Sequence, residues 1–346
     1  MKINLISDTV TKPTQEMLAF MFNAEVGDDV FKEDPTVNKL EAHAADLFGK
    51  EAALYCPSGT MTNQIAIKTH TQPLDEMICE VDSHVFQYEN GGYAFNSGIA
   101  VNTIQGKYGK LEADQVKKAI KLDYDWLPNS KIVVVENTCN KGGGSIYTLE
   151  ELNAIGKVCQ GNQLKYHLDG ARLFNALVET GDSTAAIGST FDSISICLSK
   201  GLGAPVGSLL VGDVGFIKRA RKFRKVMGGG MRQAGYIAAA GLYALENNID
   251  RLKVDNDRAK AIGSVLDQSN YVAAVKPVQS NIVIFDLIEG ITPAMFLEKL
   301  AALEIHASAF GPQSIRFVTH LDISALMIER LMEVLSTEIS SDSFHL

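Results

Sequence analysis

The chain has 346 residues, of which 46% are hydrophobic and 21% are charged, and its formal net charge is −9. This length exceeds that of one ordinary domain, and the composition is typical of a folded globular protein. The negative charge argues against nucleic acids and anionic membranes as partners, because neither polyanion gains by meeting an acidic surface. We therefore expect a large domain and a smaller one, with a small-molecule partner.

The five cysteines are scattered and form no C-x-x-C pair, so we expect buried reduced thiols and no metal site. The N-terminus turns polar within a few residues, too soon for a signal-peptide core, and no apolar run approaches the length of a membrane span. The predicted location is the cytoplasm. The cysteines are Cys56, Cys79, Cys139, Cys159 and Cys197.

Short β-branched runs alternate with longer amphipathic stretches between about residues 50 and 212. Such alternation predicts a mostly parallel sheet that is covered by helices on both faces, which is an α/β fold. The predicted strands are 52–55, 77–81, 100–104, 132–136, 164–169, 193–198 and 208–211. The predicted helices between them include 60–69, 112–121, 149–160 and 171–179.

The last third of the chain has a different pattern. Helices are predicted at about 216–227, 233–247 and 252–268. After residue 270 the pattern reads strand 282–285, helix 293–303, strand 315–318 and helix 324–335, which predicts a small C-terminal α+β unit. We therefore expect an N-terminal arm (1–15), a large domain (16–250) and a small domain (251–346).

In an open α/β sheet, ligands bind beyond the carboxyl ends of the strands. Lys200 follows one predicted strand in L-S-K-G-L-G-A-P-V-G-S, where glycines let the backbone close around an amine. Desolvation lowers the pKa of a lysine and makes it a nucleophile toward an aldehyde. The alternative is a surface lysine in a glycine-rich turn.

Asp169 ends another predicted strand, in H-L-D-G-A-R. A carboxylate at that depth needs a cationic partner, for which a protonated pyridine nitrogen is suited, although Asp169 could instead cap the next helix. Arg172 could pair with Asp169 or with a ligand anion. A strand-end aspartate followed some thirty residues later by a strand-end lysine is more informative than either residue alone.

Three further places in the chain have groups that could bind a ligand or transfer a proton. Ser58, Gly59 and Thr60 open a helix after a strand, which makes an anion site or an ordinary helix cap. His84 could stack on a flat ring or transfer protons, or could be a partly buried histidine with an ordinary hydrogen bond. Arg316, in S-I-R-F-V, could hold a substrate carboxylate or occupy an exposed strand position.

The chain resembles the L-threonine aldolase family of low-specificity type, which are pyridoxal-phosphate enzymes of fold type I with an aspartate-aminotransferase-like fold. The resemblance extends over most of the sequence, and the motifs occur in one order at matching intervals. They are S-D-T-V-T-K-P, V-G-D-D-V-F, D-P-T-V-N-K-L-E, L-Y-C-P-S-G-T-M-T-N, V-V-E-N-T-C-N, H-L-D-G-A-R-L-F-N-A, C-L-S-K-G-L-G-A-P-V-G-S-L-L-V-G and G-G-G-M-R-Q-A-G.

The resemblance implies a role for each matching residue. Lys200 would form the Schiff base with the cofactor, and Asp169 would pair with the pyridine nitrogen. His84 would stack on the ring and assist catalysis. The phosphate would be bound by Ser58, Gly59 and Thr60, and Arg172 would lie near the phenolic oxygen of the cofactor. The substrate carboxylate would be held by Ser7, Arg172 and Arg316. Lys225 and Arg232 would reach the cofactor site of a neighbouring subunit, which implies a homo-oligomer, at least a dimer and commonly a tetramer.

The sequence departs from the family at three positions. Trp126 lies ten residues before Glu136, where many members have a histidine near the substrate's β-hydroxyl, so we expect Trp126 to contact the substrate. Cys139 also replaces a usual histidine, and Ile6 stands where arginine is frequent. A tryptophan at the substrate would favour bulkier β-substituents or change the threo/erythro preference.

The implied reaction is retro-aldol cleavage of L-threonine, L-allo-threonine and related β-hydroxy-α-amino acids to glycine and an aldehyde. A water held near His84 is the favoured base for the β-hydroxyl, ahead of Lys200. The alternatives are an aldolase that prefers substrates such as phenylserine, or another reaction on the same fold, such as β-elimination or transamination. A cofactor-free binding protein that keeps the fold is the alternative from another class.

Overall fold

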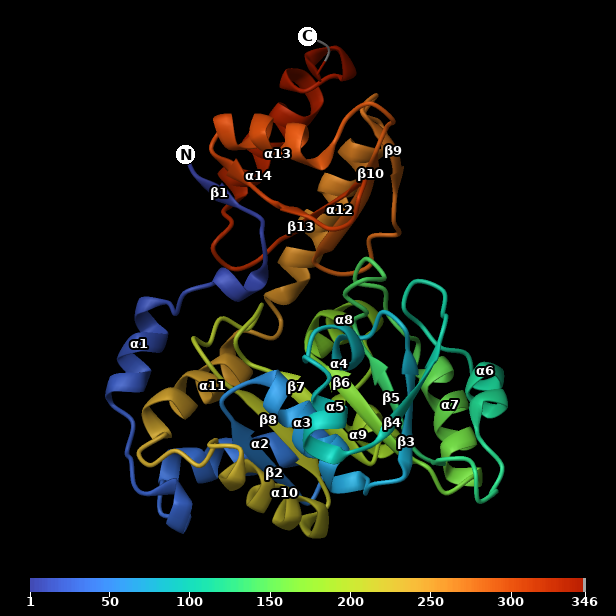
Figure 1. The fold of residues 1–346 in the computed structure, drawn as a ribbon. Coiled ribbons are helices and arrows are strands. Elements are labelled where there is room, and N and C mark those ends of the chain that lie inside the picture. Colours follow the sequence, from blue (N-terminus) through green and yellow to red (C-terminus); the bar gives the residue numbers. More distant parts are fainter. Residues whose placement is uncertain (345–346) are drawn as a thin grey trace.

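The computed structural model describes residues 1–344 and contains two main apolar cores, which belong to the lower and upper parts of Figure 1. The larger core lies on a seven-stranded sheet with the strand order β2-β8-β7-β6-β5-β3-β4. Its strands are β2 (Ala52–Cys56), β3 (Asp75–Glu80), β4 (Ala100–Ile104), β5 (Asn129–Glu136), β6 (Lys165–Gly170), β7 (Ser193–Cys197) and β8 (Ser208–Gly212).

Neighbouring strands of this sheet are parallel except at β8, which runs antiparallel to both β2 and β7. The other six strands therefore point the same way and present their carboxyl ends at one edge. Alternate residues face opposite cores, since Val133 and Val135 of β5 lie in the main core, whereas Ile132 and Val134 lie in a separate cluster. Burial on both faces explains why these strands read as continuous apolar runs.

Helices cover both faces of the sheet (Figure 1). Residues of α2, α7, α8, α9 and α11 contribute to the main core, while α3 and α10 pack together in a smaller cluster with β2 and β8. None of the helices within residues 1–344 is both long enough and apolar enough to cross a bilayer. The helices up to residue 267 are α1 (Gln15–Phe22), α2 (Pro35–Phe48), α3 (Gly59–His70), α4 (His84–Gln87), α5 (Gly92–Ser97), α6 (Ala113–Ala119), α7 (Leu149–Gly161), α8 (Leu173–Thr180), α9 (Thr184–Thr190), α10 (Val214–Val226), α11 (Gly235–Asn247) and α12 (Leu252–Asp267).

The second core lies on a four-stranded antiparallel sheet with the order β12-β13-β10-β9. The chain's own N-terminus joins it, because β1 pairs in parallel with β11 and because Ile3 and Leu5 are core residues there. Helix α12 contributes Leu252 to the first core and Leu266 to the second. The elements are β1 (Ile3–Asn4), β9 (Val272–Val275), β10 (Ile282–Leu287), α13 (Pro293–Ala302), β11 (Ile305–His306), β12 (Ser308–Ala309), β13 (Ser314–Val318) and α14 (Ala325–Glu333).

The predicted fold class is confirmed, because each of the seven strands predicted between residues 52 and 211 forms and joins one mostly parallel sheet, followed by a small C-terminal α+β unit. The elements that were not predicted include α4, β1, β9 and β12, which are too short to show a periodic pattern. The boundaries at residues 15 and 250 stay a prediction, and residues 345–346 lie outside the described range.

Candidate active site

The carboxyl edge of the large sheet brings together several of the residues that the sequence singled out. Glu136 of β5 is paired with Asp169 of β6, and Asp169 with Ser195 of β7. Lys200 lies in the turn that follows β7, where its backbone oxygen accepts a hydrogen bond from Thr11 Oγ1 at 3.1 Å. The strand-end lysine and the strand-end aspartate therefore belong to neighbouring strands and share one edge.

Asp169 is buried, and each of its oxygens accepts a hydrogen bond. Asn63 Nδ2 of α3 donates to Oδ2 at 2.9 Å, and the backbone N–H of Ala171 donates to Oδ1 at 3.2 Å. The N-cap position of α8 is occupied by Arg172, so Asp169 is not the cap of that helix. Each oxygen retains acceptor capacity for a cationic N–H, which is what a protonated pyridine nitrogen offers.

His84 begins α4 and is paired with a buried carboxylate that the sequence did not single out. Its Nδ1 lies 3.0 Å from Glu89 Oε1, and the same carboxylate accepts hydrogen bonds from Asn63 and Gln64. Burial alone would lower the pKa of His84. The hydrogen bond to Glu89 and the negative charges of Asp169, Glu89 and Glu136 outweigh burial and raise this pKa above its ordinary value. Because Glu89 accepts the hydrogen bond that His84 Nδ1 donates, Nε2 is the ring nitrogen available to a ligand or a water molecule.

His84, Glu89 and Asp169 also offer one ligand atom each within 4.8 Å of one another, a spacing that would suit a metal ion. Asn63 Nδ2, however, donates to both carboxylates, which gives this acid pair a shared hydrogen-bond donor. The cluster is therefore a hydrogen-bonded acid pair beside an imidazole.

Glu136 is a second acid of this edge, and it accepts backbone N–H groups with both oxygens. The N–H of His84 donates to Oε2 at 2.7 Å and that of Asn140 to Oε1 at 2.8 Å. Burial, followed by the charge of Asp169, raises the pKa of Glu136, and the two hydrogen bonds only partly offset this effect. Glu136 therefore fixes the loops that begin at His84 and Asn140 and holds a proton more readily than an exposed glutamate.

Arg172 is buried and forms a bidentate ion pair with Asp8 of the N-terminal arm. Its Nε and Nη2 each donate to one Asp8 oxygen at 2.7 Å. Burial opposes the charge of Asp8, but Arg172, Lys200 and Asn281 together hold the pKa of Asp8 well below its ordinary value. Asp8 thus occupies Nε and Nη2 of Arg172, and this pair connects the arm to the strand-end residues. Ser7, its neighbour, is half-buried and accepts from Thr9.

Arg316 of β13 extends from the small domain toward this cluster. It donates to Asn140 Oδ1 at 3.0 Å and to the backbone oxygen of Ile6 at 3.1 Å, and its guanidinium lies 4.4 Å from the centre of the Phe310 ring. Burial and repulsion by Arg172 lower its pKa to about 10. Its Nε is buried without a hydrogen-bond partner within residues 1–344, which fits an absent anionic ligand.

The start of α3 has the features of a phosphate site. Ser58 is the N-cap, and its Oγ accepts from the backbone N–H of Met61 at 3.2 Å, while Gly59 and Thr60 form the first helical residues. The buried hydroxyl of Ser208 has no hydrogen-bond partner within the described chain and faces Gly59, where a Cβ would lie 3.5 Å from it. Unpaired helix N–H groups and an unpaired hydroxyl fit a phosphate of the cofactor.

Lys225 and Arg232 do not join the cluster of their own chain. Both are exposed and flank the glycine-rich segment after α10, and Arg232 forms an ion pair with Asp28 at 2.7 Å. Their predicted role in a neighbouring subunit's site stays a prediction.

The prediction that Trp126 contacts the substrate is not supported by its position in its own chain. Trp126 precedes the amino end of β5, whereas Glu136 is at the carboxyl end, and eight strand residues at about 3.3 Å each separate the two edges by more than ~20 Å. The indole is 77% exposed and stacks on Tyr124. Contact with a substrate would require the site of a neighbouring copy.

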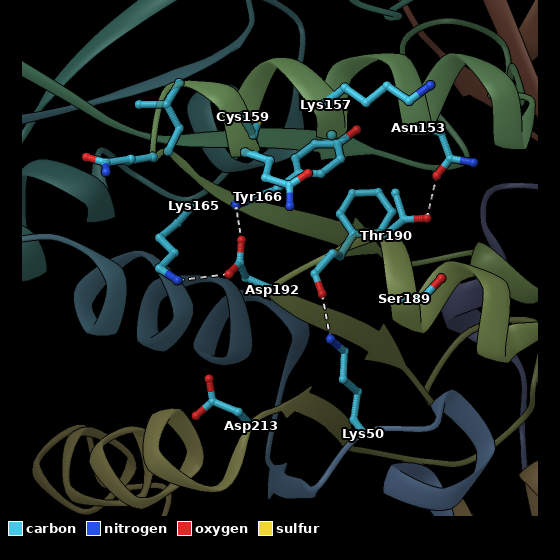
Figure 2. A pocket seen from close by; sticks show the side chains of 15 residues that line it. Lys50, Asn153, Lys157, Cys159, Lys165, Tyr166, Ser189, Thr190, Asp192 and Asp213 are labelled. Atoms are coloured by element: carbon cyan, nitrogen blue, oxygen red, sulfur yellow. Dashed lines mark hydrogen bonds and ion pairs between the residues drawn. The ribbon is translucent and has the colours of Figure 1, made fainter.

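A large groove of about 820 Å³ also lies away from the cluster, at the amino ends of β6 and β7. Figure 2 shows two of its lysines already in contact with protein groups, since Lys165 forms an ion pair with Asp192 and Lys50 donates to the backbone oxygen of Phe191. The carboxyl edge has the convergent acids, bases and unpartnered donors that a reaction needs. We therefore assign the candidate active site by chemistry rather than by cavity size.

A mostly parallel seven-stranded sheet with this strand order, followed by a small C-terminal domain, is the architecture of fold type I. Solved structures agree. The threonine aldolase of Leishmania major superposes with a TM-score of 0.84 at 21% identity, covering 96% of this chain and 98% of that one. Serine palmitoyltransferase of Sphingomonas wittichii superposes with a TM-score of 0.79 at 16% identity, covering 97% and 86%.

Sequence comparison gives the family. The family model for β-eliminating lyases matches residues 4–289. The low specificity L-threonine aldolase of Escherichia coli (strain K12) is 42% identical over 333 residues, covering 96% of this chain and 97% of that protein. A probable low-specificity L-threonine aldolase of Arabidopsis thaliana is 40% identical over 340 residues, covering 95% of both. The chain belongs to the β-eliminating lyase family and, within it, groups with the low-specificity L-threonine aldolases.

Proposed function

We propose that the protein is a pyridoxal-phosphate-dependent aldolase that cleaves L-threonine, L-allo-threonine and related β-hydroxy-α-amino acids to glycine and an aldehyde. The observation that supports it most directly is the pair of neighbouring strand ends, with Asp169 after one strand and Lys200 after the next. The family relationship supports the same reaction.

The cofactor, when bound, supplies an electrophilic carbon for amines and a ring that accepts the electron pair of a breaking carbon–carbon bond. The amine of Lys200 is the attachment point for the cofactor. The buried carboxylate of Asp169 holds a proton on the ring nitrogen, because a charged acceptor at that atom favours the protonated form. Ser58, Gly59 and Thr60 bind the phosphate through N–H and hydroxyl groups.

The remaining residues orient the substrate and move its proton. Arg316, with Ser7 and Arg172 beside it, holds the substrate carboxylate and so fixes the direction of the Cα–Cβ bond. His84 would stack on the ring of the cofactor. Because Glu89 accepts at its Nδ1, the free Nε2 takes the β-hydroxyl proton through a water molecule.

We further propose that the protein works in the cytoplasm as a homo-oligomer, at least a dimer and commonly a tetramer. Lys225 and Arg232 would complete the site of a neighbouring subunit, and their exposure in the single chain supports this arrangement. Trp126 could influence substrate choice only by reaching the active site of a neighbouring subunit.

The test is a product assay with pyridoxal phosphate and L-threonine. We expect acetaldehyde and glycine from the wild type, loss of both in Lys200→Ala and Lys200→Arg, and unchanged rates in the control Lys165→Arg at the opposite edge of the sheet. Ammonia and a 2-keto acid in place of acetaldehyde would identify a β-eliminating lyase and refute the proposal. A panel with L-allo-threonine and phenylserine then ranks the substrates.

A further inference from the structure

A chain of buried polar side chains begins at Asp169 and extends away from the proposed cofactor site, between the sheet and α3. Asn63 Nδ2 lies 2.9 Å from Asp169 Oδ2, and Asn63 Oδ1 lies 3.2 Å from His167 Nε2. His167 Nδ1 lies 2.8 Å from Ser193 Oγ, which lies 2.8 Å from His70 Nε2. No reaction step proposed above uses His167, Ser193 or His70.

These polar residues replace the apolar ones that would be expected on a buried sheet face. Tyr166 and Leu168 of β6 face the main apolar core, and the alternate residue His167 points to the opposite face with Asp169. His167 and Ser193 are both fully buried. Burying an imidazole and a hydroxyl is costly unless each group finds a hydrogen-bond partner, and here each does.

The direction of every hydrogen bond in this chain follows from the carboxylates. The Asn63 amide donates to Asp169 and to Glu89, so its oxygen must face His167. His167 Nε2 therefore carries the hydrogen, and its Nδ1 accepts from the Ser193 hydroxyl. The Ser193 oxygen in turn accepts from His70 Nε2. All four donors thus point toward the Asp169 end of the chain.

Both imidazoles have the single N–H that this direction requires. Burial, only partly opposed by the charge of Asp169, lowers the pKa of His167 to about 4. Burial also lowers the pKa of His70, whose ring stacks on Phe216 at 4.4 Å between ring centres. Each ring is therefore neutral near pH 7, and its hydrogen-bond partners determine which nitrogen carries the hydrogen.

We propose that Asn63, His167, Ser193 and His70 form a positioning chain that keeps the Asp169 carboxylate aimed at the ring nitrogen of the cofactor. The proposal rests on the proposed function. Aligned donors strengthen one another, so the last N–H of the chain meets the carboxylate with more positive charge than an isolated amide would. Without the His167 donor, Asn63 Oδ1 is buried and unpaired, so the amide that donates to Asp169 is no longer polarised or supported from its other end.

The test compares three substitutions at one position. His167→Gln keeps an amide nitrogen near the place of Nε2, whereas His167→Asn puts its amide near the place of Nδ1 and His167→Leu has neither. The affinity of each apo protein is measured for pyridoxal phosphate and for an analogue in which a C–H group replaces the ring nitrogen. Thermal unfolding of each apo protein is recorded in parallel.

We expect His167→Asn and His167→Leu to bind pyridoxal phosphate roughly tenfold or more weakly, with little change for the analogue, since a hydrogen bond to a charged group contributes on that scale. His167→Gln should retain the wild-type preference for the ring nitrogen. If His167→Leu does not fold, the Asn and Gln variants decide the question.

Equal weakening for both ligands, or lower thermal stability with an unchanged preference, would reduce the chain to a packing role and overturn the inference. A wild-type protein that binds neither ligand would instead refute the proposed function, so the two failures are distinguishable.

Discussion

Replacing Asp8 by asparagine tests how the N-terminal arm is attached. The Asp8 carboxylate is fully buried and receives two donors from the Arg172 guanidinium at 2.7 Å each and a third from Asn281 at 3.1 Å. The substituted side chain would present an amide N–H₂ to one of the two guanidinium donors and would leave the buried charge of Arg172 without a counter-ion.

The size of the effect follows from burial at both ends of the pair. The Arg172 side chain is 6% exposed and that of Asp8 is 0% exposed, so solvent screens little of the interaction. Removing one partner of a buried ion pair costs about 3–5 kcal/mol, chiefly because the other charge stays buried and unpaired. We expect Asp8→Asn to lose free energy of unfolding on that scale.

The dependence on pH has a definite sign. Because the folded-state pKa of Asp8 is lowered, the pair contributes its full stability above the ordinary aspartate pKa of 3.8 and loses it as the pH falls toward the folded value. The difference between wild type and Asp8→Asn should therefore be constant from pH 5 to pH 7 and shrink below about pH 4.

Urea unfolding at one fixed protein concentration measures this difference. Asp123→Asn is the matched control, because Asp123 is exposed in the loop after α6 and the same chemical change there should cost less than about 0.5 kcal/mol. A loss below about 1 kcal/mol in Asp8→Asn, or a loss no larger than that of the control, would refute the reasoning.

Three further predictions concern the site. Asp169→Asn should lower the rate of threonine cleavage by roughly a hundredfold or more with the fold retained, since a neutral amide no longer favours a protonated ring nitrogen; an unchanged rate would contradict that role. Arg316→Gln should raise KM for threonine by roughly tenfold or more, and Arg316→Lys should recover only part of it, because lysine lacks the fork of donors; steady-state kinetics decide. Glu89→Gln should shift to lower pH that part of the pH–rate profile in which the rate rises with pH. The reason is that Glu89 helps to raise the pKa of His84, and His84 must be unprotonated to act as the base. A shift to higher pH would exclude His84 as the titrating group.

The sequence predicted those parts of the site that depend on local pattern. Asp169 and Lys200 end or follow apolar strands, and parallel strands of one sheet necessarily bring their carboxyl ends to one edge. Ser58 was predicted to stand at a helix start, and it is the N-cap of α3, because a serine before a helix has a recognisable position.

The residues that were missed are partners across the fold. Asn63 and Glu89 lie 26 residues apart, and Asp8 is 164 residues from Arg172, so no local spacing could connect them. A weak signal for the positioning chain did exist, because K-Y-H-L-D-G alternates apolar and polar residues, which indicates a strand with one polar face.

Trp126 shows that a spacing in the sequence does not give a position in the fold. It was associated with Glu136 because the two are ten residues apart and match a family pattern, but most of those residues form one extended strand. In an extended strand each residue adds about 3.3 Å, so Trp126 lies at the far edge of the sheet from Glu136. The same ten residues in a helix would have spanned only about 15 Å.

Identification of the modified lysine tests the central claim most directly. Holoenzyme is treated with borohydride, which fixes an imine between a lysine and the cofactor aldehyde as a stable amine, and is then digested for mass spectrometry. We predict a phosphopyridoxyl group on the peptide that contains Lys200. An unmodified Lys200, with the group on another lysine or on none, would contradict the account.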